Sequence, residues 1–172
     1  MQRKAGSGSG PFTTDRGSRL AADAMLGSLA RKLRAAGFDT IYYRSGDDRG
    51  ILKICSDEKR VLVTADRQLV ATAVARGLTA LLVRGEDDRG RATSIAAAAR
   101  AVHFHLIKGP PRCSLCNSVL ATIRMTETKG MVPASVAKKH RNFLRCTGCA
   151  QVYWKGSHWK ELRSIGCRLD GT

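Results

Sequence analysis

The spacing of apolar residues alternates between two patterns along residues 18–107. Short apolar runs are followed by segments in which apolar residues return every three or four positions, and this change of period repeats four times. The apolar runs lie at residues 19–22, 40–43, 60–64 and 80–83. Helices are expected at residues 26–36, 49–59, 67–76 and 93–103. This repetition predicts an α/β fold, with a parallel sheet that has helices on both faces.

The first helical segment has the clearest pattern. Its apolar face is formed by four residues at helical spacing: Leu26, Leu29, Ala30 and Leu33. Three basic residues lie off that face: Arg31, Lys32 and Arg34. Gly37 follows directly and is the residue type that most often ends a helix. We therefore expect this helix to pack on the sheet and to present a basic side to solvent.

All four predicted strands lead directly into acidic residues, which are Asp23, Asp47 and Asp48, Asp66, and Asp87 and Asp88. Parallel strands bring their carboxyl ends to one edge of a sheet, so these acids are expected to cluster there. Clustered carboxylates repel one another, and Mg²⁺ or Mn²⁺ removes that conflict. Helix capping is the alternative, because Asp before a helix accepts backbone N–H groups. Capping explains any one of these acids, but it explains the whole set less well.

Charge and composition narrow the class of protein. The chain has 172 residues, is 43% hydrophobic and carries a net charge of +16. No apolar run approaches the roughly 20 residues of a membrane span, and no signal peptide is visible. Residues 108–172 alone hold 12 Lys and Arg against 3 Asp and Glu. This excess favours a polyanionic partner such as RNA, although a solubilising basic surface is the simpler alternative.

The second half of the chain contains two C-x-x-C pairs, Cys113 with Cys116 and Cys146 with Cys149. Two such pairs are a strong signal for zinc, because four thiolates complete a tetrahedral shell. A full shell leaves no open position, so the zinc is expected to be structural. A redox dithiol is the alternative for a single pair. Metal-binding thiols favour a reducing compartment, and we expect a cytoplasmic protein.

The predicted organisation has four parts. Residues 1–17 are rich in Gly, Ser and charge and are expected to form a flexible N-terminal tail. The α/β domain is expected over residues 18–107. A linker at residues 108–112 contains two prolines, and the zinc ribbon is expected over residues 113–167. Cys55 falls on an apolar helix face and is expected in the core.

Aromatic and basic residues alternate after the second cysteine pair. Trp154, Lys155, His158 and Lys160 lie in this stretch and are candidate RNA contacts, because aromatic rings stack on bases and lysines meet phosphates. The alternative is that Tyr153, Trp154 and Trp159 form the small core of the ribbon. A mixed arrangement, with some rings inside and the basic edge outside, is consistent with both.

Three stretches carry a resemblance to a known family: LAADAMLGSLARKLRAAGFDT, VLVTAD and CTGCAQVYWKGSHWKEL. In this order they resemble the Mutator-seven carboxy-terminal ribonuclease family, over roughly residues 18–165, and YWKGSHW is the most specific phrase. The chain departs from the family at Ala65, where arginine is usual, and at Asn117 and Ala150, where glycine usually follows each second cysteine.

The resemblance implies a PIN-like nuclease domain with an appended zinc ribbon, and cleavage of RNA with Mg²⁺ or Mn²⁺. The family's metal-binding acids fall on Asp23, Asp48 and Asp66, with a fourth at Asp87 or Asp88. The basic side of the first helix, Arg31, Lys32 and Arg34, and the ribbon would then hold RNA across the acidic edge. Two alternatives stay open: a non-catalytic protein that binds RNA or the ribosome, and a small-molecule phosphatase.

Overall fold

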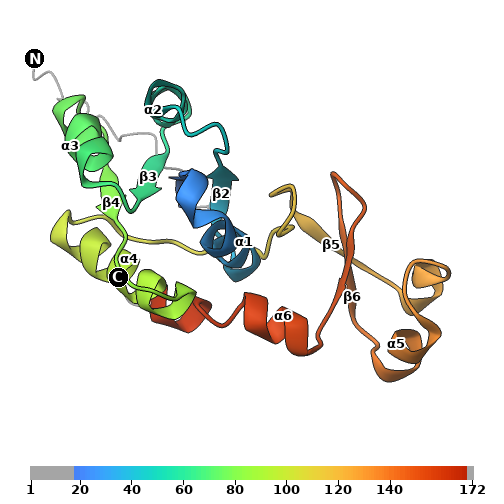
Figure 1. Cartoon of the computed structure of the whole chain (residues 1–172). Helices are drawn as coiled ribbons and strands as arrows, with labels where there is room; N and C mark the ends of the chain where they lie inside the picture. The colour runs from blue at the N-terminus through green and yellow to red at the C-terminus, as the bar shows by residue number, and fades with distance from the viewer. Residues whose placement is uncertain (1–17, 170–172) are drawn as a thin grey trace, which may run out of the picture.

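The computed structural model describes residues 18–169, so the predicted tail at residues 1–17 lies outside the described residues. The described chain forms an α/β domain and a smaller ribbon that extends from one side of it (Figure 1). None of the helices among the described residues is both long enough and apolar enough to span a membrane.

A parallel four-stranded sheet forms the centre of the α/β domain, as the sequence predicted. Its strands are β1 (Arg19–Ala22), β2 (Asp39–Tyr42), β3 (Val61–Thr64) and β4 (Ala80–Leu82). They lie in the order β2-β1-β3-β4. Ala22 is in register with Val63, so the ends of β1 and β3 are neighbours. Because ligands bind beyond the carboxyl ends of parallel strands, this pair of ends is the natural position for a site.

Helices cover both faces of the sheet (Figure 1). One face carries the short 3-10 helix η1 (Ala24–Leu26), α1 (Gly27–Ala36) and α4 (Asp88–Ala101). The other face carries α2 (Asp48–Asp57) and α3 (Arg67–Ala75). Adjacent residues of β3 belong to different apolar clusters, with Val61 and Val63 on the first face and Leu62 on the second. Both faces are therefore buried, as expected for parallel strands.

The fourth helix begins earlier than the sequence pattern predicted. Helix α4 starts at Asp88, whereas apolar periodicity placed its start at Thr93. Asp87 caps the helix by accepting the Gly90 N–H at 2.7 Å. Because this cap provides a start for the polar first turn, the helix does not need apolar residues there.

The ribbon is a three-stranded antiparallel sheet in the order β5-β6-β7. Its strands are β5 (Leu120–Ile123), β6 (Phe143–Cys146) and β7 (Val152–Trp154). The connection from β5 to β6 forms the outer end of the ribbon (Figure 1). It contains the 3-10 helix η2 (Met125–Thr128) and α5 (Ala134–Lys139).

After the ribbon, the chain returns to the α/β domain. Helix α6 (Ser157–Leu162) packs against α1, and the 3-10 helix η3 (Gly166–Leu169) packs against α4. Ile165 is fully buried and Leu169 is 1% exposed, and both belong to the core that includes α1 and α4. The end of the predicted ribbon, residues 163–167, therefore packs with the first domain rather than with the cysteines.

Polar contacts join the ribbon to the edge of the sheet. The buried guanidinium of Arg34 donates to the carbonyl oxygens of Thr40 at 2.7 Å, Ser114 at 3.0 Å and Leu115 at 2.9 Å. Asn117 donates through Nδ2 to Asp39 at 2.8 Å and accepts the Thr40 N–H at 3.1 Å. The first cysteine turn is thus fixed to α1 and β2.

The predicted linker at residues 108–112 also lies against α1. The Gly109 N–H donates to the carbonyl of Gly37 at 2.9 Å, and the Arg112 N–H donates to that of Arg34 at 2.9 Å. Gly37 has φ 109°, and a side chain there would clash with the carbonyl oxygen of Gly109. Glycine thus ends α1 and allows the linker to approach it closely.

Candidate active site and metal centre

Thr64 connects the ends of β1 and β3. Asp23 follows β1, and its carboxylate accepts the Met25 N–H at 3.0 Å, which caps η1. The hydroxyl of Thr64 donates to the other oxygen of Asp23 and accepts the Asp66 N–H at 3.0 Å. Thr64 is fully buried and Asp23 is 8% exposed. This one buried hydroxyl therefore fixes two of the predicted site acids relative to each other.

Asp66 and Asp47 cap the helices that follow their strands. Asp66 accepts the N–H groups of Gln68 at 2.7 Å and Leu69 at 3.2 Å, both through Oδ1. Within the described residues no hydrogen bond reaches its Oδ2. Asp47 caps α2, and Asp48 is the exposed first residue of that helix. Capping is thus confirmed for several of the acids, and it leaves an oxygen of Asp66 open to a ligand.

A pocket of about 130 Å³ lies between these acids. Four carboxylates line it: Asp23, Asp47, Asp48 and Asp66. Tyr43 and Met25 also line it, and Met25 is 69% exposed. Among residues 18–169, however, these carboxylates do not form a group of three with oxygens within 4.8 Å of one another. The acids of the described chain thus share a pocket at the carboxyl edge of the sheet, but no three of them are close enough to share one ion in this arrangement.

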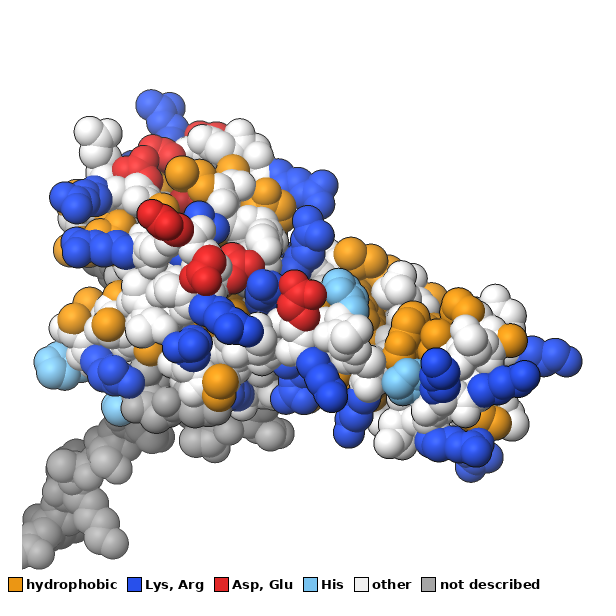
Figure 2. All heavy atoms as spheres, turned by 60° about the horizontal axis from the view of Figure 1, so that its bottom comes forward, with side chains coloured by type: hydrophobic (Ala, Val, Ile, Leu, Met, Phe, Trp, Pro, Cys, Tyr) orange, Lys and Arg blue, Asp and Glu red, His pale blue; other side chains and the backbone are white. Residues whose placement is uncertain are grey.

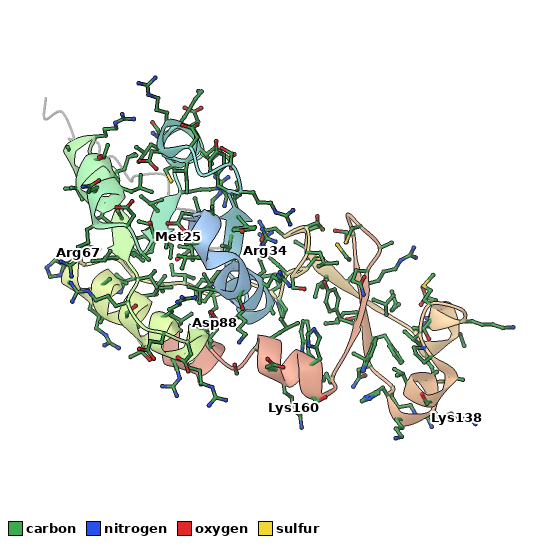
Figure 3. The ribbon with its side chains drawn as sticks, in the orientation of Figure 1. Met25, Arg34, Arg67, Asp88, Lys138 and Lys160 are labelled. Atoms are coloured by element: carbon green, nitrogen blue, oxygen red, sulfur yellow. The ribbon has the colours of Figure 1, made fainter. Side chains whose placement is uncertain are left out.

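Asp87 and Asp88 do not line this pocket. Asp87 caps α4, while Asp88 accepts the Ser28 hydroxyl at 2.6 Å and pairs with Lys32 at 3.1 Å. The side chain of Asp88 is only 10% exposed and lies beside α1 (Figure 3). Strand β4 is separated from β1 by β3, and α4 crosses to the face of α1, so the fourth pair of acids is directed away from the others. Asp47, which the resemblance to the family did not select, lines the pocket together with Asp48.

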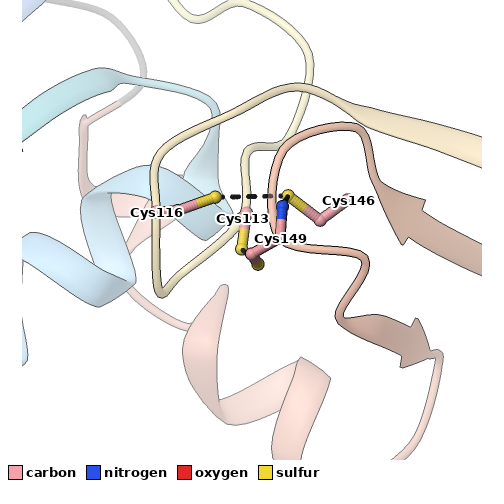
Figure 4. A group of neighbouring side chains, drawn as sticks. All are labelled: Cys113, Cys116, Cys146 and Cys149. Atoms are coloured by element: carbon pink, nitrogen blue, oxygen red, sulfur yellow. Dashed lines mark hydrogen bonds between the residues drawn. The ribbon is translucent and has the colours of Figure 1, made fainter.

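The four cysteines come together as the spacing predicted (Figure 4). Their sulfur atoms all lie within 4.8 Å of one another. Cys113 Sγ is 3.5 Å from Cys149 Sγ, and Cys116 Sγ is 3.3 Å from Cys146 Sγ. In a tetrahedral zinc site with Zn–S bonds of about 2.3 Å, neighbouring sulfurs are about 3.8 Å apart. The four thiols therefore fit a zinc ion in number, type and spacing.

Backbone geometry completes both cysteine turns. The N–H groups of Gly148 and Cys149 each donate to Cys146 Sγ at 3.3 Å. Asn117 and Ala150, the residues after each second cysteine, have φ of 70° and 60°. Left-handed backbone favours glycine, and asparagine tolerates it better than alanine. The two departures from the family pattern thus occupy equivalent turns, each in the left-handed conformation that glycine favours.

Hydrogen bonds around the cysteines change their acidity. The contact with Ser118 lowers the pKa of the Cys116 thiol to about 6, which favours the thiolate that a metal binds. Tyr153 is buried, and its hydroxyl lies 3.1 Å from both Cys113 Sγ and Ser114 Oγ. Burial raises the pKa of Tyr153, so its hydroxyl stays neutral beside Cys113. Cys55 is buried as predicted, and burial raises its pKa to about 11.

The three basic residues of α1 have different environments. Arg31 is exposed, as predicted. Lys32 has a side chain that is 18% exposed and is paired with Asp88. The position of Arg34 does not favour the predicted contact with RNA, because the residue is 7% exposed and its guanidinium binds three carbonyl oxygens at the junction with the ribbon (Figure 3). The ribbon covers the side of α1 that the helical pattern alone left open.

The aromatic stretch of the ribbon has both inward and outward residues. Trp159 is 5% exposed, and its ring lies 5.5 Å from that of Tyr153 in the ribbon core. Lys155, His158 and Lys160 are exposed, while Trp154 is half-buried. Trp154 and His158 line a cavity of about 210 Å³ beside the first cysteine turn. Two of the aromatic rings therefore serve the core, and the basic edge stays available.

Acidic and basic side chains occupy different parts of the surface. On the face shown in Figure 2, acidic groups lie over the α/β domain, and lysines and arginines surround them. The outer end of the ribbon shows Lys, Arg and apolar side chains. A polyanion that crosses this face would meet cations on both domains and carboxylates between them.

Together, the parallel sheet with helices on both faces and the four-cysteine cluster define a mixed α/β protein whose C-terminal part fits a zinc ribbon. Residues 18–165 match the model of the Mut7-C RNAse domain. The chain therefore belongs to the Mut7-C RNAse domain family, which confirms the resemblance seen in the sequence. Comparisons with curated proteins and with solved structures gave no match.

Proposed function

We propose that this protein is a Mg²⁺- or Mn²⁺-dependent ribonuclease that hydrolyses RNA phosphodiester bonds. In this proposal the α/β domain is PIN-like, and the zinc ribbon assists RNA binding. The observation that carries it is the pocket at the carboxyl edge of the parallel sheet, lined by Asp23, Asp47, Asp48 and Asp66. Membership of an RNase-domain family adds support.

The donor set of the pocket suits a hard divalent cation, because carboxylate oxygens are the ligands that Mg²⁺ and Mn²⁺ prefer. Asp23, Asp48 and Asp66 would hold the ion, and the open Oδ2 of Asp66 is one such ligand atom. When bound, the ion lowers the pKa of a water molecule and offsets the charge that develops on the phosphate. The 130 Å³ pocket between these acids leaves room for such an ion.

Other residues of the chain would orient the carboxylates and bind the RNA. Thr64 keeps Asp23 in one orientation through its buried hydroxyl. The capping hydrogen bonds of α3 and η1 restrict Oδ1 of Asp66 and Oδ1 of Asp23. Arg31 on α1 and Lys155, His158 and Lys160 on the ribbon are exposed cations or polar groups that would bind the RNA backbone. Trp154 would stack on an unpaired base.

A non-catalytic protein that binds RNA or the ribosome is the alternative. One observation favours it: Asp23, Asp47, Asp66 and Asp87 all cap helices, so each has a structural role without metal. The two proposals predict different results when one carboxylate loses its charge and keeps its ability to cap.

Asp66→Asn provides that test, since asparagine caps a helix about as well as aspartate. If Asp66 is a metal ligand, cleavage of single-stranded RNA in Mn²⁺ should fall by about 100-fold or more, roughly 3 kcal/mol in the barrier. Thermal stability should hold or rise, because one of several mutually repelling carboxylates is removed. Asp57→Asn, at an exposed position on α2 outside the pocket, is the matched control and should cleave normally.

Near-normal cleavage by Asp66→Asn would refute the ligand role and favour the non-catalytic alternative. The same assay on Asp47→Asn and Asp87→Asn identifies the fourth acid. Both residues are helix caps, so capping alone predicts equal, small effects. A large loss for only one of them assigns that residue to the site.

A further inference from the structure

A groove of about 690 Å³ lies at the outer end of the ribbon, between η2 and α5. Its apolar wall includes Met125, Val132 and Ala137. Its volume falls within the range of about 300–1,000 Å³ in which proteins bind small ligands. The groove is at the opposite end of the molecule from the acidic pocket, with Lys138 marking its position in Figure 3. It is therefore separate from the site described above.

The charged side chains that line this groove are all positive. Lys129, Lys138 and Arg141 line it and are exposed, and no acidic residue among residues 18–169 lines it. Glu127 is the one acid in residues 124–142, and its carboxylate accepts the Arg124 N–H at 2.8 Å, so it caps η2. The groove thus combines an apolar floor with an uncompensated cationic rim, and it fits a ligand with negative charge and a flat or apolar part.

Arg141 adds a more specific feature. Its Nη1 lies 3.6 Å from Met125 Sδ, so the guanidinium rests against the apolar wall of the groove. A planar guanidinium in this position can stack on a base while its remaining N–H groups bind a phosphate. An acidic peptide would satisfy the cations but would leave this flat surface without a matching group.

We propose that the groove binds an unpaired nucleotide of a single-stranded RNA, with the base on the apolar floor and the flanking phosphates on Lys129, Lys138 and Arg141. This inference rests on the proposed function and extends it. The groove and the acidic pocket lie at opposite ends of the molecule, so an RNA that occupies both must span the ribbon. The substrate is then an extended single strand, held at the ribbon's outer end while it is cleaved at the sheet edge.

The test is the affinity of the full-length protein for a fluorescent, mixed-sequence, single-stranded RNA of 20 nucleotides, measured by anisotropy without added divalent cation. Each lost phosphate contact lowers affinity about fivefold at 0.1 M salt and reduces the salt slope by about 0.7. Lys138→Gln should show this loss, and Lys138→Gln/Arg141→Gln should lose about 25-fold. Lys139→Gln is the matched control: Lys139 is the next residue of α5, is exposed and does not line the groove.

A second variant tests the apolar floor. Ala137→Leu fills the groove without a change of charge, so affinity should fall several-fold while the salt slope stays constant. Zinc content and a thermal melt verify that each variant is folded. Equal losses for Lys138→Gln and Lys139→Gln, or full affinity in Ala137→Leu, would overturn the proposal.

A labelled poly-glutamate peptide separates the two classes of partner. If Lys138→Gln/Arg141→Gln loses the peptide but keeps the RNA, the groove binds an acidic protein segment and the proposal is wrong. Because every readout is binding without metal, failure here is distinct from failure of the catalytic proposal, which depends on cleavage by Asp66→Asn.

Discussion

The two parts of this protein are stabilised by different means. The α/β domain buries two apolar clusters, one on each face of its sheet. The ribbon has one small cluster that includes two of its cysteines, Tyr153 and Trp159. That cluster also needs Ala35 of α1 and Leu162 of α6. A domain with a full core tolerates local change, whereas the ribbon shares its small core with its neighbour and is built around four cysteines that fit a zinc ion.

Loss of zinc should produce the largest difference in stability between the ribbon and the α/β domain. Structural zinc contributes about 10–16 kcal/mol of apparent binding free energy in zinc-finger peptides, so Cys146→Ser should lose zinc and unfold the ribbon. The α/β domain should stay folded with a lower melting temperature, because residues 163–169 lose their attachment. Metal analysis and hydrogen exchange read by mass spectrometry measure both effects. Cys167→Ser, which alters an exposed cysteine outside the cluster, should keep zinc and a protected ribbon.

A substitution at the junction between α1 and the ribbon should have the next largest effect on stability. Arg34→Met removes the donor to three buried or partly buried carbonyl oxygens, and the unfolding free energy should fall by about 3 kcal/mol. Arg31→Met, on the exposed side of the same helix, should change it by less than about 0.5 kcal/mol and should weaken RNA binding instead. Urea unfolding measures the first quantity. Equal stability of the two variants would show that the ribbon is not fixed through Arg34.

Asp39 adds a dependence on pH. Burial opposes its charged form, but hydrogen bonds from Arg60 and Asn117 outweigh burial and lower the pKa of Asp39 below its ordinary 3.8. A lowered folded-state pKa stabilises the protein above pH 3.8, and this contribution disappears as the pH falls through the folded value. Asp39→Asn should therefore be destabilised by about 2 kcal/mol at pH 7, and the difference from wild type should shrink at pH 3.

Chemical denaturation at the two pH values measures that difference. Asp57→Asn is the control, since the Asp57 side chain is 55% exposed and pairs with Lys53 one turn earlier in α2. A constant gap between wild type and Asp39→Asn across the pH range would contradict the assignment.

The smallest expected change in stability comes from glycine substitutions in the two cysteine turns, and its sign should differ between them. Ala150→Gly should stabilise the zinc-loaded protein by up to about 1 kcal/mol, because glycine relieves the left-handed strain. Asn117→Gly should destabilise it despite the same backbone conformation, because its side chain bonds to Asp39 and Thr40 are lost. Melting temperatures with zinc present compare them. Shifts in the same direction would indicate that backbone strain alone governs both turns.

Local patterns in the sequence predicted the fold well. The four apolar runs and the cysteine spacing each depend on residues close together in the chain, and both were confirmed. The start of α4 was missed, because its polar first turn depends on the Asp87 cap rather than on apolar periodicity.

Features that depend on how distant segments pack were harder to predict. Arg34 lies off the apolar stripe, and only the docked ribbon explains why it is buried. Likewise, Asp87 and Asp88 follow a strand as the other acids do, but the position of α4 directs Asp88 to Lys32. The part played by Thr64 has a local signal in retrospect, since a hydroxyl two residues before a strand-end acid reaches that acid's N–H.

The return of residues 163–169 to the α/β core has a consequence for biosynthesis. Ile165 and Leu169 cover apolar surface on α1 and α4, but they follow the whole ribbon in the chain. During translation residues 18–107 emerge first, and that surface stays exposed until the ribbon has been made. Binding of zinc by the four cysteines would fold the ribbon, so residues 163–169 would have fewer conformations to sample before they reach the α/β core. The metal would then influence how quickly the newly made first domain is protected from aggregation, although none of its ligands belongs to that domain.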